Sequence, residues 1–233
     1  LLTFIAGGRV LLRDSLEEFS SKLKEQVLAF SGAFTFPIKA EMFEEIVSRH
    51  ALTPMGIANI WNPGSHKQGT DIDLPSEELF FSVKSAKVSG VNKQPMSISS
   101  FRTTKYCSLD EKLSFIDGDG KNFSHYFVLA RKEKETKEKV LIERKYTALI
   151  VPADQFLAKN MTWKETKSGW ESEEKYDGEI GYAMRIQKKM SDQLWIYCDF
   201  KKLKKDPNVK VLFSVTIPAE QLGNTHEIVR RAA

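Results

Sequence analysis

Two long β-type segments in the middle of the chain place the strongest limit on its fold. Residues 125–131 (HYFVLAR) and 139–153 (KVLIERKYTALIVPA) are rich in β-branched and aromatic residues, which are typical of strands. The charged run between them, RKEKETKEK, is expected to be a solvated hairpin tip. Three further strand candidates follow, GEIGYAMRIQ, DQLWIYCDF and VKVLFSVTIP. The second half of the chain is therefore expected to build most of a β-sheet.

Two amphipathic helices are expected ahead of these strands, over residues 14–30 and 38–52, because apolar residues recur there at helical spacing. The stripes are Leu16, Phe19, Leu23, Val27 and Phe30 in the first segment, and Met42, Phe43, Ile46, Val47 and His50 in the second. Residues 97–106 (SISSFRTTKY) are polar and basic, which indicates a loop or the first turns of a helix. Helices early and strands later predict one α/β domain, a mixed central sheet flanked by helices.

The formal net charge is +4, and the distribution of charges along the chain is more informative about binding partners than this sum. No Asp or Glu occurs between Leu79 and Leu109, and five basic residues fall inside this stretch: Lys84, Lys87, Lys93, Arg102 and Lys105. A local basic stretch in a nearly balanced protein favours a surface that binds polyanions such as nucleic acid. An accident of local composition is the alternative explanation.

The two cysteines and the apolar runs bear on the compartment. Cys107 and Cys198 are far apart in the sequence, which suits neither a disulfide framework nor a zinc site and favours a reducing cytoplasm. No apolar run approaches the roughly 20 residues of a membrane helix. The segment LLTFIAGGRVLL has no basic region before its apolar residues, so it makes a poor signal peptide. We expect a cytoplasmic protein without a membrane partner.

The segment GTDIDLPSEELFFSVKSAKV, residues 69–88, is expected to be a hairpin with one polar face. Strand alternation brings four polar residues to that face: Asp71, Asp73, Ser82 and Lys84. A tight turn at residues 75–78 would place Asp71 opposite Ser82 and Asp73 opposite Phe80. A small change of register would place Asp73 opposite Ser82 instead, so alternation alone does not rank the two aspartates.

Carboxylates beside a lysine suit phosphodiester hydrolysis. Mg²⁺ prefers oxygen ligands, usually one or two carboxylates with substrate phosphate and water. A neighbouring lysine can lower the pKa of the attacking water or stabilise negative charge that builds on phosphorus. The alternative is a half-exposed hairpin with an ordinary cross-strand pair of an acid and a lysine.

The hairpin also resembles a known motif. The string D-x8-S-V-K, preceded by Gly-Thr and followed by a basic polar segment, is similar to the motif of PD-(D/E)xK nucleases, in the S-V-K form found among type II restriction endonucleases. The resemblance covers roughly residues 40 to 106. It implies that Asp73, or Asp71, binds metal, that Ser82 holds the variable middle position and that Lys84 is catalytic. The motif's proline is missing before the aspartate.

Because the middle position is a serine, a second carboxylate has to come from elsewhere. No acidic residue lies between Lys84 and Lys105 to provide it. The segment FEEIV, residues 43–47, resembles the F-E-x-h-h setting (h, apolar) of the family's first helix. The resemblance therefore implies Glu44 as the second carboxylate, with Glu45 as the substitute.

The resemblance implies a fold, an activity and a set of site residues. The fold would be restriction-endonuclease-like: one nuclease domain over residues 1–233, with a catalytic core at about 38–156 and a strand-rich part at about 157–233. The activity would be that of a Mg²⁺-dependent, sequence-specific endonuclease that cuts double-stranded DNA as a homodimer and leaves 5′-phosphates. Its expected catalytic residues are Asp73, Lys84, Glu44 and Ser82, its metal ligands Asp73, Glu44 and Asp71, and its DNA-binding residues Lys87, Lys93, Ser100, Arg102, Thr103 and Lys105.

Two alternatives stay open at this point. Serine in place of the middle acid favours a non-catalytic DNA-binding module on a degenerate nuclease scaffold. A structure-specific DNA repair nuclease, which cuts junctions or flaps regardless of sequence, is the other.

Overall fold

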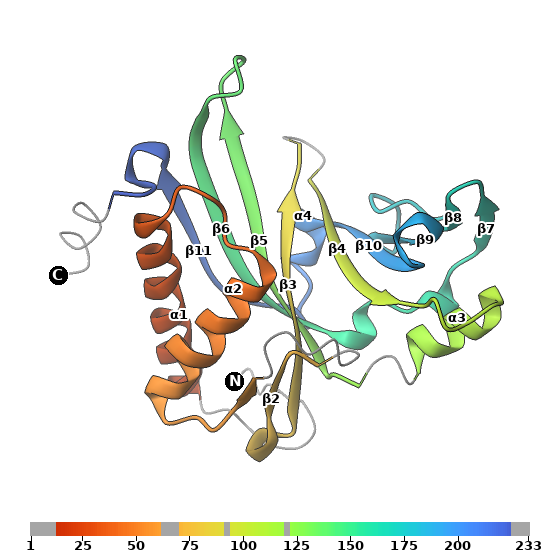
Figure 1. Cartoon of the computed structure of the whole chain (residues 1–233), viewed down its shortest axis with the longest axis horizontal. Coiled ribbons are helices and arrows are strands. Elements are labelled where there is room, and N and C mark those ends of the chain that lie inside the picture. The colour runs from red at the N-terminus through yellow and green to blue at the C-terminus, as the bar shows by residue number, and fades with distance from the viewer. Residues whose placement is uncertain (1–12, 62–69, 91–93, 119–121, 225–233) are drawn as a thin grey trace.

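One large mixed β-sheet forms the centre of the structure and carries helices on its faces (Figure 1). The structure is a computed structural model, and it describes residues 13–61, 70–90, 94–118 and 122–224. The helices are α1 (Arg13–Ala33), α2 (Ala40–Glu45), α3 (Leu109–Asp117) and α4 (Phe200–Leu203). The strands are β1 (Ile60–Trp61), β2 (Ile72–Leu74), β3 (Leu79–Val88), β4 (Pro95–Arg102), β5 (His125–Glu135), β6 (Leu141–Pro152), β7 (Trp163–Thr166), β8 (Gly169–Ser172), β9 (Tyr182–Gln187), β10 (Gln193–Asp199) and β11 (Lys210–Pro218). The expected α/β class with a mixed sheet is therefore confirmed.

Strand β3 is the centre of the sheet. The strand order is β11-β6-β5-β3-β4-β10-β9-β8-β7, with β2 also paired to β3 and β1 to β2. Strands β3 and β5 run parallel, and the other pairings of the described strands are antiparallel. On its other edge, β3 pairs with β2 at residues 79–81 and with β4 at residues 87–88. Within the described residues, no strand therefore pairs with this edge at 82–86.

Two apolar cores lie on opposite faces of the central strands. Alternation along β3 sends Leu79, Phe81 and Val83 to one face, and Ala86 and Val88 to the other. On the first face α1 and α2 pack over β5, β6 and β11 (Figure 1). The buried residues of the predicted α1 stripe are Phe19, Leu23 and Val27. Both predicted helices are thus confirmed. On the second face, a separate core brings together buried residues of β3, β4, β5, β6, β9 and β10.

The second helix departs from regular α geometry after Glu45. Residues Ile46–Leu52 form a π-helix, and Thr53–Met55 add a 3₁₀ turn. The wider π turn buries Ser48, Ala51 and Leu52 and leaves His50 exposed. The prediction that His50 lies on the apolar side of the helix is therefore wrong.

Strand β4 corrects another prediction. Most of the segment 97–106, expected to be a loop or a helix start, continues a strand that ends at Arg102. Its buried residues Met96, Ile98 and Phe101 are two and then three positions apart. The register against β10 shifts between Gln193 and Trp195, which absorbs the extra residue. The irregularity hides the period of two by which a strand is recognised.

No helix in the described ranges is both long enough and apolar enough to cross a membrane. Cys107 is exposed and Cys198 is buried, and both are free thiols.

Candidate active site

The hairpin adopts the register that places Asp71 on the side of Ser82. Ile72 pairs with Phe81, Asp73 with Phe80 and Leu74 with Leu79. Between the strands, a 3₁₀ turn at Pro75–Glu77 ends at Glu78, whose φ of 53° is left-handed. Asp71, one residue before β2, therefore comes beside Ser82.

The carboxylate of Asp71 binds three donors through one oxygen. Its Oδ2 accepts hydrogen bonds from the backbone N–H of Val83 at 2.7 Å, from Lys84 Nζ at 3.1 Å and from Ser82 Oγ at 3.3 Å. Among the described residues, no donor contacts the other oxygen, Oδ1. Three donors therefore hold one oxygen of this carboxylate in place, and the other oxygen accepts no hydrogen bond from the described residues.

The free edge of β3 explains why Asp71 is held there. Strand β2 begins at Ile72, so within the described residues the N–H of Val83 has no strand partner on this edge, and Asp71 supplies the acceptor instead. The Asp71 and Lys84 side chains are 23% and 19% exposed. The ion pair is thus partly shielded from water, and salt screens such a pair less than it screens a pair on an open surface.

Glu44 on α2 completes the cluster. Its Oε2 accepts a hydrogen bond from Trp61 Nε1 at 3.3 Å. Burial, and then repulsion by Asp71, raise the pKa of Glu44 to about 7, against the lowering effects of Trp61 and Lys84. Asp71 and Lys84 therefore lie close enough to Glu44 to shift its pKa, although the three residues come from a helix and from either side of a hairpin turn.

Two hydrogen bonds at Ile38 fix the start of α2 against the sheet. Its N–H donates to the hydroxyl of Tyr146 at 3.0 Å, and its carbonyl accepts from Ser85 Oγ at 3.0 Å. Ile38 and Tyr146 are buried, and Ser85 follows Lys84 directly. The helix that carries Glu44 is therefore bonded to the strand that carries Lys84.

Asp73 lies away from the position expected for the metal-binding aspartate. Its partners in the pairing are Phe80 of β3 and Ile60 of β1, two cross-strand pairs nearer the turn than Asp71. Asp71 is the aspartate bonded to Lys84 and Ser82. Alternation left the two aspartates unranked, and the hairpin register assigns the contact with the lysine to Asp71. The metal-binding role expected of Asp73 stays a prediction.

The predicted DNA-binding residues lie in different environments. Lys87, Arg102 and Lys105 are exposed, although alternation puts Lys87 on the opposite face of β3 from Lys84. Ser100 is half-buried, with its Oγ 3.1 Å from the Tyr126 hydroxyl. Lys93 lies outside the described residues.

Thr103 does not suit a DNA contact. It is fully buried and donates its hydroxyl to the carbonyl of Asp192 at 2.9 Å. Its side chain connects the end of β4 to the start of β10, so the prediction for Thr103 is wrong.

Sequence reasoning missed three residues that shape the cluster: Trp61, Ser85 and Tyr146. Trp61 falls in the segment IWNPGSHKQG, which has the composition of a connector rich in turns. The contacts of all three join elements distant in sequence, and no local pattern signals them.

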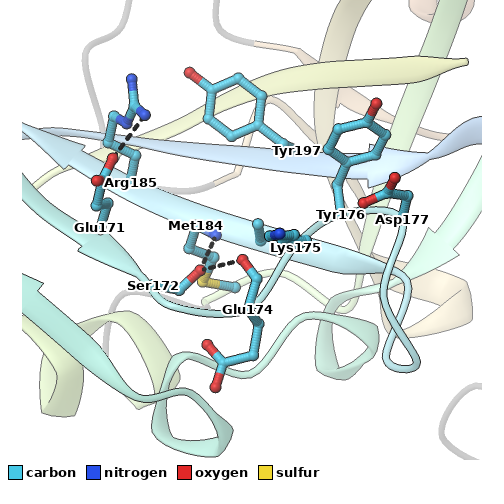
Figure 2. Close-up of a pocket in the computed structure, with 10 residues that line it drawn as sticks. Glu171, Ser172, Glu174, Lys175, Tyr176, Asp177, Met184, Arg185 and Tyr197 are labelled. Carbon is cyan, nitrogen blue, oxygen red and sulfur yellow. Dashed lines mark hydrogen bonds and ion pairs between the residues drawn. The ribbon is translucent and has the colours of Figure 1, made fainter. Parts of the chain in front are cut away.

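A hollow on β8, β9 and β10 offers different chemistry (Figure 2). Its lining includes Tyr176, Tyr197 and the ion pair of Arg185 with Glu171, at 2.7 Å. None of the predicted catalytic residues lines it. The hollow and the hairpin cluster are therefore separate parts of the structure.

The described residues contain no ready-made group of three or more His, Cys, Asp or Glu side chains placed to hold a metal ion. Glu44 of α2 and Asp71 of the hairpin are the two carboxylates that this cluster offers to a cation. No protein-family model matches the chain, and no curated protein or solved structure is detectably similar to it.

Proposed function

We propose that this chain is a Mg²⁺-dependent endonuclease that hydrolyses phosphodiester bonds of double-stranded DNA. The observation that carries the proposal is the contact of Asp71 with Lys84 and Ser82 at the unpaired edge of β3, with Glu44 beside it. It supplies two carboxylates and a cation on a rigid strand and a packed helix. A hard divalent ion commonly binds one or two carboxylates and leaves its other positions to phosphate and water.

Glu44 and Asp71 fit a divalent cation on electrostatic grounds. Asp71 raises the pKa of Glu44, so the two carboxylates repel each other when both are charged. A bound cation would relieve this repulsion, and Oδ1 of Asp71 accepts no hydrogen bond from the described residues. Mg²⁺ would polarise the phosphate and lower the pKa of a bound water.

Lys84 and Ser82 have separate roles in the proposed reaction. A bond forms between the water oxygen and phosphorus while the bond from phosphorus to O3′ breaks, and the water's proton ends on the 3′ oxygen. One water is consumed, and a 5′-phosphate and a 3′-hydroxyl result. The Lys84 ammonium orients the water and stabilises the charge that develops on phosphorus. Ser82 donates to Asp71 and keeps its carboxylate oriented.

The charge pattern is what supports DNA as the substrate in this proposal. The stretch without Asp or Glu, between Leu79 and Leu109, contains β3 and β4 and exposes Lys87, Arg102 and Lys105. Lysine and arginine side chains at such positions contact phosphates and fix register. We infer that the scaffold is restriction-endonuclease-like and that cleavage is sequence-specific. We also infer a homodimer, since one site in each protomer would cut one strand of the duplex.

Digestion of a mixed-sequence plasmid tests this proposal. We expect Mg²⁺ to support cleavage into discrete bands, and EDTA to abolish it. Mg²⁺-dependent cleavage without discrete bands, and with preference for flaps or junctions, would point to a structure-specific repair nuclease instead. Light scattering of the free protein and of its DNA complex tests the homodimer.

A non-catalytic DNA-binding module is the second candidate. Ser82 stands where an acid is common, and only two carboxylates meet in the cluster among the described residues. DNA binding without any cleavage in Mg²⁺ or Mn²⁺, across varied duplexes, would favour this candidate and reject the first.

A further inference from the structure

Trp61 connects the helix that carries Glu44 to the ribbon of β1 and β2. Its indole Nε1 donates to Oε2 of Glu44 at 3.3 Å. Its backbone pairs with Ile72, the residue that follows Asp71. One residue therefore connects the carboxylate of Glu44, through its indole, to the strand that begins directly after Asp71, through its backbone pairing.

Arg49 holds the same indole from its face. Its guanidinium carbon lies 4.9 Å from the centre of the Trp61 ring, and its Nη1 lies 3.5 Å from Oε1 of Glu45. Arg49 belongs to the π-helical continuation of α2. The helical segment thus holds the ring by a stacked cation and by a hydrogen bond at its edge.

This arrangement matters because the two carboxylates stand on separate elements. Residues that hydrogen-bond to a metal-binding carboxylate fix its orientation, and their loss commonly weakens the site. We propose that Trp61 is a positioning residue that fixes the carboxylate of Glu44 with respect to Asp71, and so sets the affinity of the site for a divalent cation. The inference rests on the proposed function.

Trp61→Phe is the direct test, because phenylalanine keeps a ring for Arg49 and removes the indole N–H. The probe is Mn²⁺ alone, titrated against the free protein and followed by the electron paramagnetic resonance of the unbound ion. We expect Trp61→Phe to weaken Mn²⁺ binding on the order of 10- to 100-fold. The matched control is Trp163→Phe, which removes another indole hydrogen bond, from Nε1 to the carbonyl of Ala158 at 3.0 Å. The control should bind Mn²⁺ as the unmodified protein does.

Glu44→Gln separates a failure of this inference from a failure of the proposed function. Unchanged Mn²⁺ binding in Glu44→Gln would reject the metal site itself. Weaker binding in Glu44→Gln with unchanged binding in Trp61→Phe would overturn only the role of Trp61. When both variants bind weakly, Trp61→Phe should add nothing in the Glu44→Gln background, whereas an additive loss would indicate general damage and contradict the inference.

Arg49→Ala gives the same test if Trp61→Phe does not fold. It leaves the indole N–H in place and removes the cation from the ring. We expect a smaller loss of Mn²⁺ affinity, roughly two- to fivefold. If Trp61→Phe does not fold, no loss of Mn²⁺ affinity in a folded Arg49→Ala protein would reject the inference.

Discussion

The ammonium of Lys84 lies 3.1 Å from Oδ2 of Asp71, across the turn of one hairpin. The same oxygen accepts the backbone N–H of Val83 at 2.7 Å, so the strand itself helps to hold the carboxylate in place. The pair is a fixed feature of the free edge of β3. If the pair is catalytic as proposed, changes at either residue should affect cleavage more than folding.

Lys84 and Lys87 should have different effects on cleavage. Lys84 contacts Asp71, whereas Lys87 is exposed on the other face of β3. We expect Lys84→Met to lower the single-turnover cleavage rate about 100-fold or more, as the loss of a charge-stabilising donor does. Lys87→Met should instead weaken DNA binding and reduce its salt slope by about one. Equal rates at saturating DNA for Lys84→Met and the unmodified protein would contradict the role of Lys84.

The pKa of Glu44 predicts how folding stability depends on pH. Burial and Asp71 raise this pKa from 4.5 to about 7, so the folded protein binds the proton more tightly than the unfolded chain does. The favourable contribution is complete below 4.5 and is lost as the pH rises through about 7. Glu44→Gln cannot ionise, and thermal denaturation should show it to be more stable than the unmodified protein at pH 8. The difference should vanish near pH 4, and a less stable Glu44→Gln protein at pH 8 would contradict this account.

Mn²⁺ binding should also depend on the protonation of Glu44. Its affinity should rise with pH, whereas the contribution of Glu44 to folding stability falls. Protonated Glu44 is a poor ligand, so Mn²⁺ affinity should fall as the pH falls through about 7. Because Lys84 lowers the pKa of Glu44, Lys84→Met should move the midpoint of this change to a higher pH. Titrations of Mn²⁺ at a series of pH values measure both effects. A midpoint that stays near the ordinary value of 4.5 would show that Glu44 is not the controlling group.

The hydrogen bond from Ile38 to Tyr146, which holds the start of α2 against the sheet, can be tested without reference to activity. Tyr146→Phe removes the acceptor for the N–H of buried Ile38. An unsatisfied buried amide costs about 1–3 kcal/mol, so the free energy of unfolding should fall by that amount. Urea denaturation of the variant and the unmodified protein measures the difference.

Tyr106→Phe is the matched control for Tyr146→Phe. The ring of Tyr106 stacks on Phe115 with centroids 4.6 Å apart, and its hydroxyl contacts no hydrogen-bond partner among the described residues. Removing that hydroxyl should leave the free energy of unfolding nearly unchanged. Equal stabilities for the two variants would show that the bond to Ile38 contributes nothing.

Much of the fold follows from patterns that extend over several residues. The helix at α1 and the strands β5, β6, β9, β10 and β11 lie where their apolar periodicity predicts them. Alternation leaves two hairpin registers open, and the structure has the one with Asp71 beside Ser82. Patterns of this kind are strong because one face of each element is buried.

Elements with short or interrupted patterns escape prediction. Helix α3 is not recognised from its apolar pattern, although Ser108 and Glu111 form a capping box at its start. The hairpin of β7 and β8 has strands of only four residues each. Strand β4 resembles a loop because Phe101 breaks the alternation that Met96 and Ile98 begin.

The candidate site is predictable in its residue types and not in its contacts. Glu44, Asp71, Ser82 and Lys84 can all be selected from the sequence. The choice of Asp71 over Asp73 depends on where β2 begins, and the orientation of Glu44 depends on Trp61. The first is set by the register of the hairpin, which alternation leaves open, and the second by a contact between separate elements, which no local pattern reports.

The two aspartates of the hairpin give the most direct test of the central claim. Asp71→Asn and Asp73→Asn are isosteric changes two residues apart, and it is Asp71 that contacts Lys84. The measurement is the single-turnover rate of plasmid cleavage in saturating Mg²⁺, with DNA binding checked separately. We predict that Asp71→Asn binds DNA and loses cleavage by about 100-fold or more, while Asp73→Asn stays within about tenfold of the unmodified protein. Cleavage by Asp71→Asn at the unmodified rate would contradict the account.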